Sequence, residues 1–169
     1  KSFQCLRGGG AAPEVAKVHA RGPGGGPDLA PLERALVQLG EDLQGLVHAL
    51  PYAGVSLTAT HAVLTRPYVF SSLHDRVGTR PFPSGAEQRW LAFQLLHALA
   101  RLHERGLCHG DLKAENVLIT SWGWLYVSDF APYKPVLLPE DDPADFSYFF
   151  DAGSRRRCYV APERFCSRA

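Results

Sequence analysis

Apolar residues recur along this chain with two spacings, one typical of helices and one typical of strands. Between residues 28 and 50 they recur every three or four positions, which predicts an amphipathic helix that begins after Asp28 and ends before Pro51. A second run of helical spacing begins after Ser84 and ends at Gly106, and its large apolar residues are expected to supply apolar contacts. They are Trp90, Phe93, Leu95, Leu96, Leu99 and Leu102. Other short apolar stretches predict strands at residues 2–6, 14–19, 55–60, 62–69, 117–119 and 125–127.

The order of these elements predicts an α+β fold in two parts. Residues 1–69 carry most of the predicted strands around one helix, whereas residues 70–169 begin with a short helix at 71–76 and the long helix after it. Residues 132–160 carry few regular signals, and a segment of that length without elements of its own is usually functional or disordered.

Composition narrows the classes of protein to consider. The chain has 169 residues, of which 46% are hydrophobic and 21% charged, enough to bury the core of one modest domain. A net charge of +1 gives no reason to expect nucleic acid or an anionic membrane as the main partner. The 4 cysteines form no Cys-x-x-Cys pair, which favours reduced thiols in an intracellular protein. Because the chain begins with Lys1 and has neither an initiator methionine nor a signal peptide, a fragment is expected.

A polar loop at residues 109–116 carries the strongest chemical signal in the sequence. It reads His-Gly-Asp-Leu-Lys-Ala-Glu-Asn and lies between the end of the long helix and the strand at 117–119. The carboxylate of Asp111 can orient a hydroxyl and take its proton, and the ammonium of Lys113 can neutralise charge on a phosphoryl group in transfer. The amide oxygen of Asn116 can bind Mg²⁺. The loop therefore predicts phosphoryl transfer with Asp111 and Lys113 as catalytic residues.

Asp129 follows the second strand of the predicted hairpin and is the other candidate metal ligand. A carboxylate at that place, near the loop acid, can hold a metal ion that bridges the phosphates of a nucleotide. Asn116 and Asp129 together are therefore the predicted Mg²⁺ ligands.

These motifs resemble those of eukaryotic protein kinases. His109-Gly110-Asp111 with Asn116 is similar to the catalytic-loop motif H-R-D-L-x-x-x-N. Asp129-Phe130-Ala131 is similar to D-F-G, and Ala161-Pro162-Glu163 matches the A-P-E motif that closes a kinase activation segment. The stretch at 15–18, Val-Ala-Lys-Val, is similar to the strand that carries the phosphate-binding lysine.

The kinase resemblance implies a bilobal protein-kinase-like fold, truncated at both ends, with ATP and Mg²⁺ as ligands. Residues 1–69 would form a partial N-lobe, and residues 70–169 a partial C-lobe that runs through the activation segment. Lys17 would contact the nucleotide phosphates. Glu33, on the helix at 28–50, would pair with Lys17, and Glu41 is the alternative partner.

The part from about residue 68 to 165 carries further, more specific motifs. They include Asp75, Arg76, Arg89, Trp90, Trp122, Trp124 and the runs at 79–82, 92–94, 138–141, 143–146, 148–151 and 161–165. With these motifs the chain resembles the vacuolar-sorting regulatory subunits that partner the class III phosphatidylinositol 3-kinase. The resemblance implies a serine/threonine kinase-type subunit in autophagy and endosomal sorting, with the lipid kinase catalytic subunit and its adaptor subunits as partners. It implies a cytoplasmic protein, peripheral on late endosome and autophagosome membranes through parts outside this chain.

The sequence also departs from ordinary kinases, which leaves several functions open. Gly110 stands where most kinases have the arginine that pairs with a phosphorylated activation loop, and Ala131 stands in place of the D-F-G glycine. No glycine-rich nucleotide loop precedes Lys17. A protein kinase, a pseudokinase scaffold that binds nucleotide or partners, and a small-molecule phosphotransferase all remain candidates. Lys113 and the Ala-Pro-Glu closure favour the first two over the third.

Overall fold

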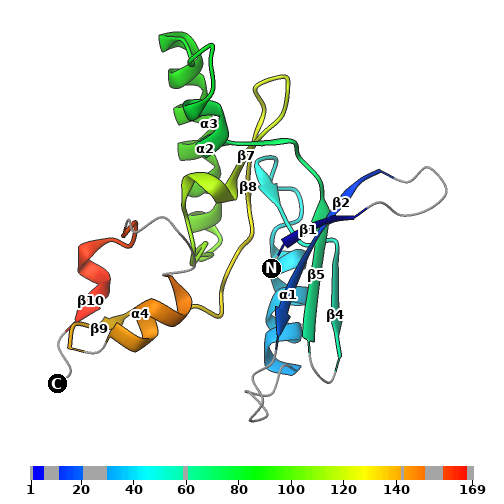
Figure 1. Ribbon diagram of the computed structural model, residues 1–169, viewed down its shortest axis with the longest axis vertical. Helices are drawn as coiled ribbons and strands as arrows, with labels where there is room; N and C mark the ends of the chain where they lie inside the picture. Colours follow the sequence, from blue (N-terminus) through cyan, green and yellow to red (C-terminus); the bar gives the residue numbers. More distant parts are fainter. Residues whose placement is uncertain are drawn as a thin grey trace.

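The computed structural model describes residues 2–5, 12–20, 30–58, 61–141, 143–150 and 158–166. Strands β1, β2, β4 and β5 with helix α1 lie on one side of the molecule, and helix α3 lies on the other (Figure 1). The β7–β8 hairpin lies between them. This arrangement, rich in strands on one side and in helices on the other, confirms the predicted α+β fold. Within the described residues, no helix is both long enough and apolar enough to cross a membrane.

The first sheet is antiparallel, with the strand order β1-β2-β5-β4. Its strands are β1 (Ser2–Cys5), β2 (Glu14–Ala20), β4 (Gly54–Leu57) and β5 (His61–Pro67), close to four predicted strands. Along β5 the buried side chains alternate with more exposed ones, so Ala62, Leu64 and Arg66 share the inner face. An arginine at such a position requires a buried partner.

Helix α1 (Ala30–Asp42) is shorter than the sequence predicts, so the expected helix over residues 28–50 is wrong for residues 43–50. Gly45 has a φ of +74°, a conformation in which glycine commonly ends helices. Residues 49 and 50 form strand β3 (Ala49–Leu50) instead. The apolar side chains at 46 and 49 still pack against the core, which explains why the apolar spacing continues past the end of the helix. The predicted N-cap, Asp28, lies outside the described residues.

The second sheet has the order β3-β8-β7-β6, and it contains the predicted hairpin. Its other strands are β6 (Ser71–Ser72), β7 (Val117–Ile119) and β8 (Leu125–Ser128). Strand β3 runs parallel to β8, with Ala49 opposite Val127, whereas the other two pairings are antiparallel. The parallel pair joins the segment after α1 directly to the strand that precedes Asp129.

The helical part contains α2 (Leu73–Gly78) and α3 (Gly85–Glu104), and side-chain caps mark where each begins. Ser72 and Asp75 form a capping box on α2, and the side chain of Ser84 accepts from the backbone N–H of Glu87 on α3. Gln94 of α3 is fully buried, where it donates to the carbonyl of Gly123 at 2.9 Å and accepts from the N–H of Leu125 at 3.0 Å. This amide fixes α3 to the hairpin.

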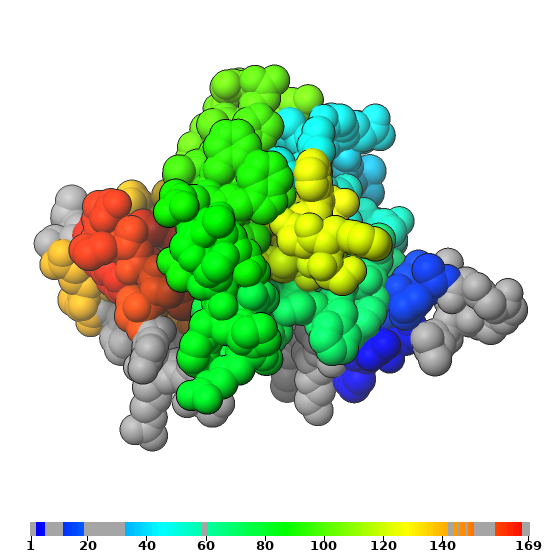
Figure 2. All heavy atoms as spheres, turned by 90° about the horizontal axis from the view of Figure 1, so that it is seen from above, coloured from blue at the N-terminus to red at the C-terminus, as the bar shows by residue number. Residues whose placement is uncertain are grey.

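Three of the large apolar residues of α3 do not contact the core. Trp90, Phe93 and Leu96 are largely exposed, because the buried face of the helix is the narrower stripe that includes Leu91, Ala98 and Leu102. The apolar contact that Trp90 and Phe93 do make is with each other, with 5.7 Å between their ring centroids. Figure 2 shows α3 (green) at the surface beside the turn of the β7–β8 hairpin (yellow).

Residues 132–160 contain more regular structure than the sequence predicts. Helix α4 (Pro143–Phe149) lies within them, and strand β9 (Leu138–Pro139) pairs in parallel with β10 (Phe165–Cys166). A short 3₁₀ turn, η2 (Pro162–Arg164), precedes β10. These elements enclose a small core of their own, because aromatic side chains are frequent in this segment. It consists of Leu138, Phe146, Phe149, Phe150, Val160 and Phe165.

Candidate active site

The loop after α3 is held by the buried side chain of His109. Its Nδ1 accepts the backbone N–H of Asp111 at 3.2 Å, so its Nε2 carries the proton and donates to the carbonyl oxygen of Ser128 at 2.8 Å. The ring also packs against Phe130, with 4.6 Å between centroids. Burial lowers the pKa of His109, although the hydrogen bond to Ser128 opposes that effect. The imidazole therefore positions the loop in its neutral form.

Acidification is expected to destabilise the protein through His109. Since the folded-state pKa of His109 lies below its ordinary value of 6.5, the unfolded chain binds a proton that the folded chain does not. This contribution is fully present above pH 6.5 and is lost as the pH falls toward the folded-state pKa. Denaturant melts at about pH 7.5 and about pH 5.5 measure the loss. In His109→Asn, which does not titrate, the loss should be smaller; an equal loss in both proteins would contradict the prediction.

The carboxylate of Asp111 is surrounded by donors. Nδ2 of Asn116, at the end of the 3₁₀ turn η1 (Ala114–Asn116), donates to the Asp111 backbone carbonyl at 2.8 Å and to its Oδ2 at 3.1 Å. The ammonium of Lys113 lies 3.0 Å from Oδ2, and that of Lys134 lies 3.0 Å from Oδ1. The hydroxyl of Tyr159 also donates to Oδ1. Both carboxylate oxygens are therefore engaged.

These contacts keep Asp111 ionised. Burial alone would raise its pKa, but the hydrogen bonds from Tyr159, Lys134 and Lys113 outweigh burial and lower the pKa below its usual range. Tyr133 lies under the influence of the same charge: burial together with the carboxylates of Asp111 and Asp129 raises its pKa to about 12. A substrate hydroxyl that binds Asp111 would have to displace one of the donors that contact its two oxygens.

Asp129 is buried and holds two cations. Its φ of +63° is rare for a residue with a side chain. Lys17 of β2 lies 2.7 Å from Oδ2, while Arg66 of β5 donates from Nε to Oδ1 at 2.9 Å and from Nη2 to Oδ2 at 3.3 Å. Burial would raise the pKa of Asp129, but Arg66 and Lys17 together lower it below the usual range. The ion pairs fix the orientation of this carboxylate.

The predicted pairing of Lys17 with Glu33 is not formed. Among the described residues, neither Glu33 nor Glu41 makes an ion pair with Lys17, whose ammonium contacts Asp129 instead. The physical reason is burial, because an ammonium beside a buried carboxylate gains more than it would from the half-buried Glu33 or the exposed Glu41 on α1. A part for Glu33 in holding the nucleotide stays a prediction.

Gly110 lies where the loop at residues 109–116 crosses the segment at residues 128–131. Its φ is +81°, and a Cβ built on it would lie 2.2 Å from the carbonyl oxygen of Ala131. The backbone N–H of Ala131 donates to the carbonyl of His109 at 2.9 Å, and the hydroxyl of Ser128 donates to the carbonyl of Asn116 at 3.0 Å. Glycine is therefore required at 110 for the catalytic loop and the Asp129 segment to approach this closely.

The predicted magnesium ligands fit the ion only in part. The nitrogen of the Asn116 amide contacts Asp111, which leaves the amide oxygen as an available ligand. Both oxygens of Asp129 are held by Arg66 and Lys17, so this carboxylate does not fit a metal ion while those contacts last. In the part of the chain that the structure describes, no three His, Cys, Asp or Glu residues gather as a metal site.

The structure thus groups the predicted residues as two neighbouring clusters. Asp111, Lys113 and Asn116 form one, and Lys17 with Asp129 forms the other. The hydrogen bonds that Ser128 and Ala131 donate to the loop at the Gly110 crossing join the two clusters. Such an arrangement can bind phosphates beside Lys17 and place an acceptor hydroxyl at Asp111. These clusters also contain Arg66, Lys134 and Tyr159, which the sequence motifs did not predict.

Comparison with known proteins decides the family. The model of the protein kinase domain matches residues 46–168 of this chain. The chain belongs to the protein kinase family. The match begins after α1, so it covers β3 to β10 and both clusters except Lys17.

Individual protein kinases similar to this chain come from distant eukaryotes. Serine/threonine-protein kinase VPS15 of Arabidopsis thaliana is 61% identical over 104 residues, which are 62% of this chain and 7% of the relative. The vps15 kinase of Schizosaccharomyces pombe is 55% identical over 115 residues, 68% of this chain and 7% of the relative. The VPS15 kinase of Saccharomyces cerevisiae is 44% identical over 118 residues, 69% of this chain and 8% of the relative. The chain therefore spans less than a tenth of the length of these curated relatives.

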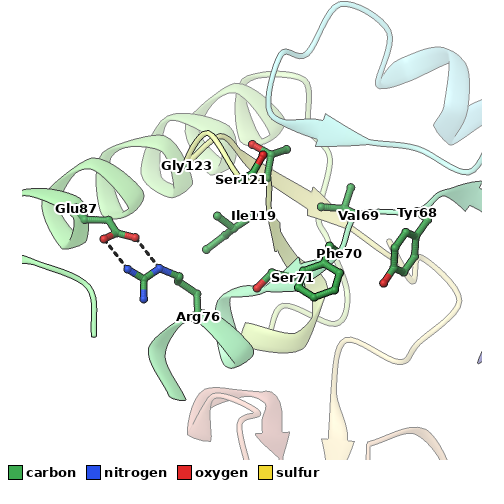
Figure 3. A pocket seen from close by; sticks show the side chains of 10 residues that line it. Tyr68, Val69, Phe70, Ser71, Arg76, Glu87, Ile119, Ser121 and Gly123 are labelled. Carbon is green, nitrogen blue, oxygen red and sulfur yellow. Dashed lines mark hydrogen bonds and ion pairs between the residues drawn. The ribbon is translucent and has the colours of Figure 1, made fainter. Parts of the chain in front are cut away.

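A separate hollow of about 570 Å³ lies between the segment after β5 and the end of β7 (Figure 3). Arg76 and Glu87 face each other at its edge, joined by two hydrogen bonds of 2.7 Å. None of the residues of the two kinase clusters lines it. Its other lining residues are Tyr68, Val69, Phe70, Ser71, Ile119, Thr120, Ser121 and Gly123.

Proposed function

We propose that this chain carries the nucleotide and acceptor sites of a serine/threonine protein kinase, which transfers the γ-phosphoryl group of ATP to a protein hydroxyl. The observation that supports this most is the hydrogen-bonded crossing at Gly110, which holds the Asp111 loop against the segment of Asp129. Two separated carboxylates fixed in this way, each beside lysines, suit a reaction that moves an anionic group between two oxygens.

Each residue has a distinct part in the proposed reaction. Lys17 binds the nucleotide phosphates, and Lys113 offsets charge on the transferring phosphoryl group. The acceptor oxygen forms a bond to the γ-phosphorus while the bond from that phosphorus to the ADP oxygen breaks, and the hydroxyl proton passes to Asp111. Mg²⁺, when bound, neutralises charge on the phosphates, and the amide oxygen of Asn116 would hold it.

A second candidate, a pseudokinase scaffold, is favoured by one specific contact set. Tyr159 and Lys134 both contact Oδ1 of Asp111, while Lys113 and Asn116 contact Oδ2, so neither oxygen is free for an acceptor hydroxyl. In a scaffold, Tyr159 and Lys134 would stay bound to Asp111 permanently. The site would then bind a nucleotide or a partner without transferring phosphate. In a kinase the segment that carries Lys134 and Tyr159 moves aside when the acceptor arrives.

The motifs between about residues 68 and 165 support a proposal about the cellular setting as well, because they resemble those of the vacuolar-sorting regulatory subunits. On that resemblance, the protein would act as a regulatory subunit beside the class III phosphatidylinositol 3-kinase and its adaptor subunits. Autophagy and endosomal sorting on late endosome and autophagosome membranes would be its setting, with membrane attachment through other parts of the protein. This setting leaves the chemistry at Asp111 to be tested separately.

The test compares wild-type protein with Asp111→Asn, using phosphate transfer to protein and capture of the lipid kinase subunit as two measurements. A kinase should lose at least about a hundredfold in transfer rate, the usual size of a general-base contribution, and keep its partner. No transfer by the wild type, with the partner still captured, would establish the scaffold. Failure to capture the lipid kinase would overturn the proposed setting.

A further inference from the structure

Arg66 is a charged residue on the inner, apolar face of a strand. Its neighbours on that face of β5 are Ala62 and Leu64, each 2% exposed, and Arg66 itself is 6% exposed. In the β2–β5 register Lys17 lies opposite Leu64, which makes Lys17 and Arg66 diagonal neighbours on one face of the sheet. Two cations are therefore built into the sheet side by side, above Asp129.

The contact between Arg66 and Asp129 is bidentate. Nε and Nη2 of Arg66 reach the two different oxygens of Asp129, and Nη1 donates to the carbonyl of Pro67 at 3.1 Å. The side chains of the pair are 8% and 5% exposed, so water screens their charges weakly. Planar guanidinium binding of this kind also fixes the orientation of the carboxylate.

The balance of charge around the two carboxylates is positive. Among the residues that the structure describes, Lys17 and Arg66 contact Asp129, and Lys113 and Lys134 contact Asp111, so four cations contact two carboxylates. In metal-dependent kinases, a metal ion offsets the negative charge of a carboxylate that faces the nucleotide phosphates. In this site the lysine and arginine side chains already supply positive charge at that place. A polyphosphate would meet a surplus of cations without any added ion.

We infer that Arg66 does for Asp129 what a magnesium ion does in metal-dependent kinases, so that the protein binds a nucleoside triphosphate without Mg²⁺. The inference rests on the proposed nucleotide site and adds a property to it. For a metal ion to use Asp129, the guanidinium would have to leave a buried carboxylate and remain buried without a partner, which is strongly unfavourable. Asn116 is then the one predicted metal ligand whose oxygen is available.

The alternative is that the Arg66–Asp129 pair forms only in the absence of nucleotide and opens when nucleotide binds. In that case Mg²⁺ will be required for nucleotide binding, as in an ordinary kinase. Removing Arg66 would then change binding equally with and without the metal ion. The two arrangements differ in whether the effect of Arg66 depends on Mg²⁺.

The experiment measures ATP binding to the whole purified protein by calorimetry, in Mg²⁺ and in EDTA. Wild-type affinity should change less than about threefold when Mg²⁺ is removed. In Arg66→Gln the affinity should fall at least about tenfold in EDTA, because Asp129 then repels the phosphates, yet stay within about threefold of wild type in Mg²⁺, because the ion replaces the lost cation. Arg76→Gln breaks a similar bidentate pair outside the site and should change neither value.

Each outcome decides between the possibilities. Wild-type binding that requires Mg²⁺ overturns the inference and leaves the proposed function standing, and it does so even if Arg66→Gln fails to fold. Equal weakening of Arg66→Gln under both conditions also overturns it. No ATP binding under either condition overturns the proposed nucleotide site and this inference with it.

Discussion

Replacing Gly110 with alanine is expected to lower the free energy of unfolding by about 2–5 kcal/mol. Two costs add at this position. A residue with a Cβ at a φ of +81° is strained by about 1–2 kcal/mol. The new Cβ would also lie 2.2 Å from the carbonyl oxygen of Ala131, a backbone atom, and such overpacking adds about 1–3 kcal/mol. Since Ala131 is hydrogen-bonded to His109, relief of the clash would separate the two clusters.

Gly123→Ala provides the matched control for Gly110→Ala. Gly123 has a φ of +72°, but a Cβ there would meet nothing within 4 Å, so only the backbone strain of about 1–2 kcal/mol applies. Denaturant unfolding of both variants measures the difference. Equal losses would show that the crossing at Gly110 is looser than the structure indicates. The result also bears on Gly110→Arg, which should disrupt the site although it restores the residue most kinases carry.

Replacing Asp129 with asparagine is expected to cost about 3–5 kcal/mol of stability. The substitution keeps the shape of the side chain but leaves Arg66 buried opposite a neutral group, and breaking one half of a buried pair is costly for that reason. The double variant with Arg66→Leu should recover a large part of the loss, because no buried charge then lacks a partner on that side.

An exposed ion pair serves as the comparison for Asp129→Asn. Arg101 and Glu104 on α3 are 54% and 58% exposed, so Glu104→Gln should change stability by less than about 1 kcal/mol. Thermal or denaturant melting of all four proteins gives the values. If Asp129→Asn were no more harmful than Glu104→Gln, the Arg66–Asp129 pair would not be a buried one in solution.

Much of the fold was predictable because its signals are local. Alternation along β5, the capping residue Ser84 and the glycine at 106 each act within a few positions, and the structure confirms the elements they predict. The catalytic loop was predictable for the same reason, since Asp111 and Asn116 lie five residues apart on one turn. Their roles in catalysis stay predictions.

The errors came from contacts between residues far apart in sequence. The apolar residues after α1 form strand β3 because they pair with β8. The spacing of the apolar residues along the chain does not predict this pairing. Lys134 and Tyr159 reach Asp111 from a segment whose fold depends on its own aromatic cluster. Arg66 differs from these residues, because the sequence does contain a sign of its role. It is a charged residue on the inner face of a strand whose buried and exposed positions alternate.

The pairing of β3 with β8 has a consequence for the order in which the chain is completed. Ala49 pairs with Val127, 78 residues later, so β3 cannot find its partner until the hairpin has been synthesised. At about 5–20 residues per second this takes roughly 4–16 s. Meanwhile Leu36 and Leu39 of α1, together with Leu43 just after it, lack the hairpin residues that share their core. During translation, the nascent N-terminal part would be a ready substrate for chaperones that bind exposed apolar helices.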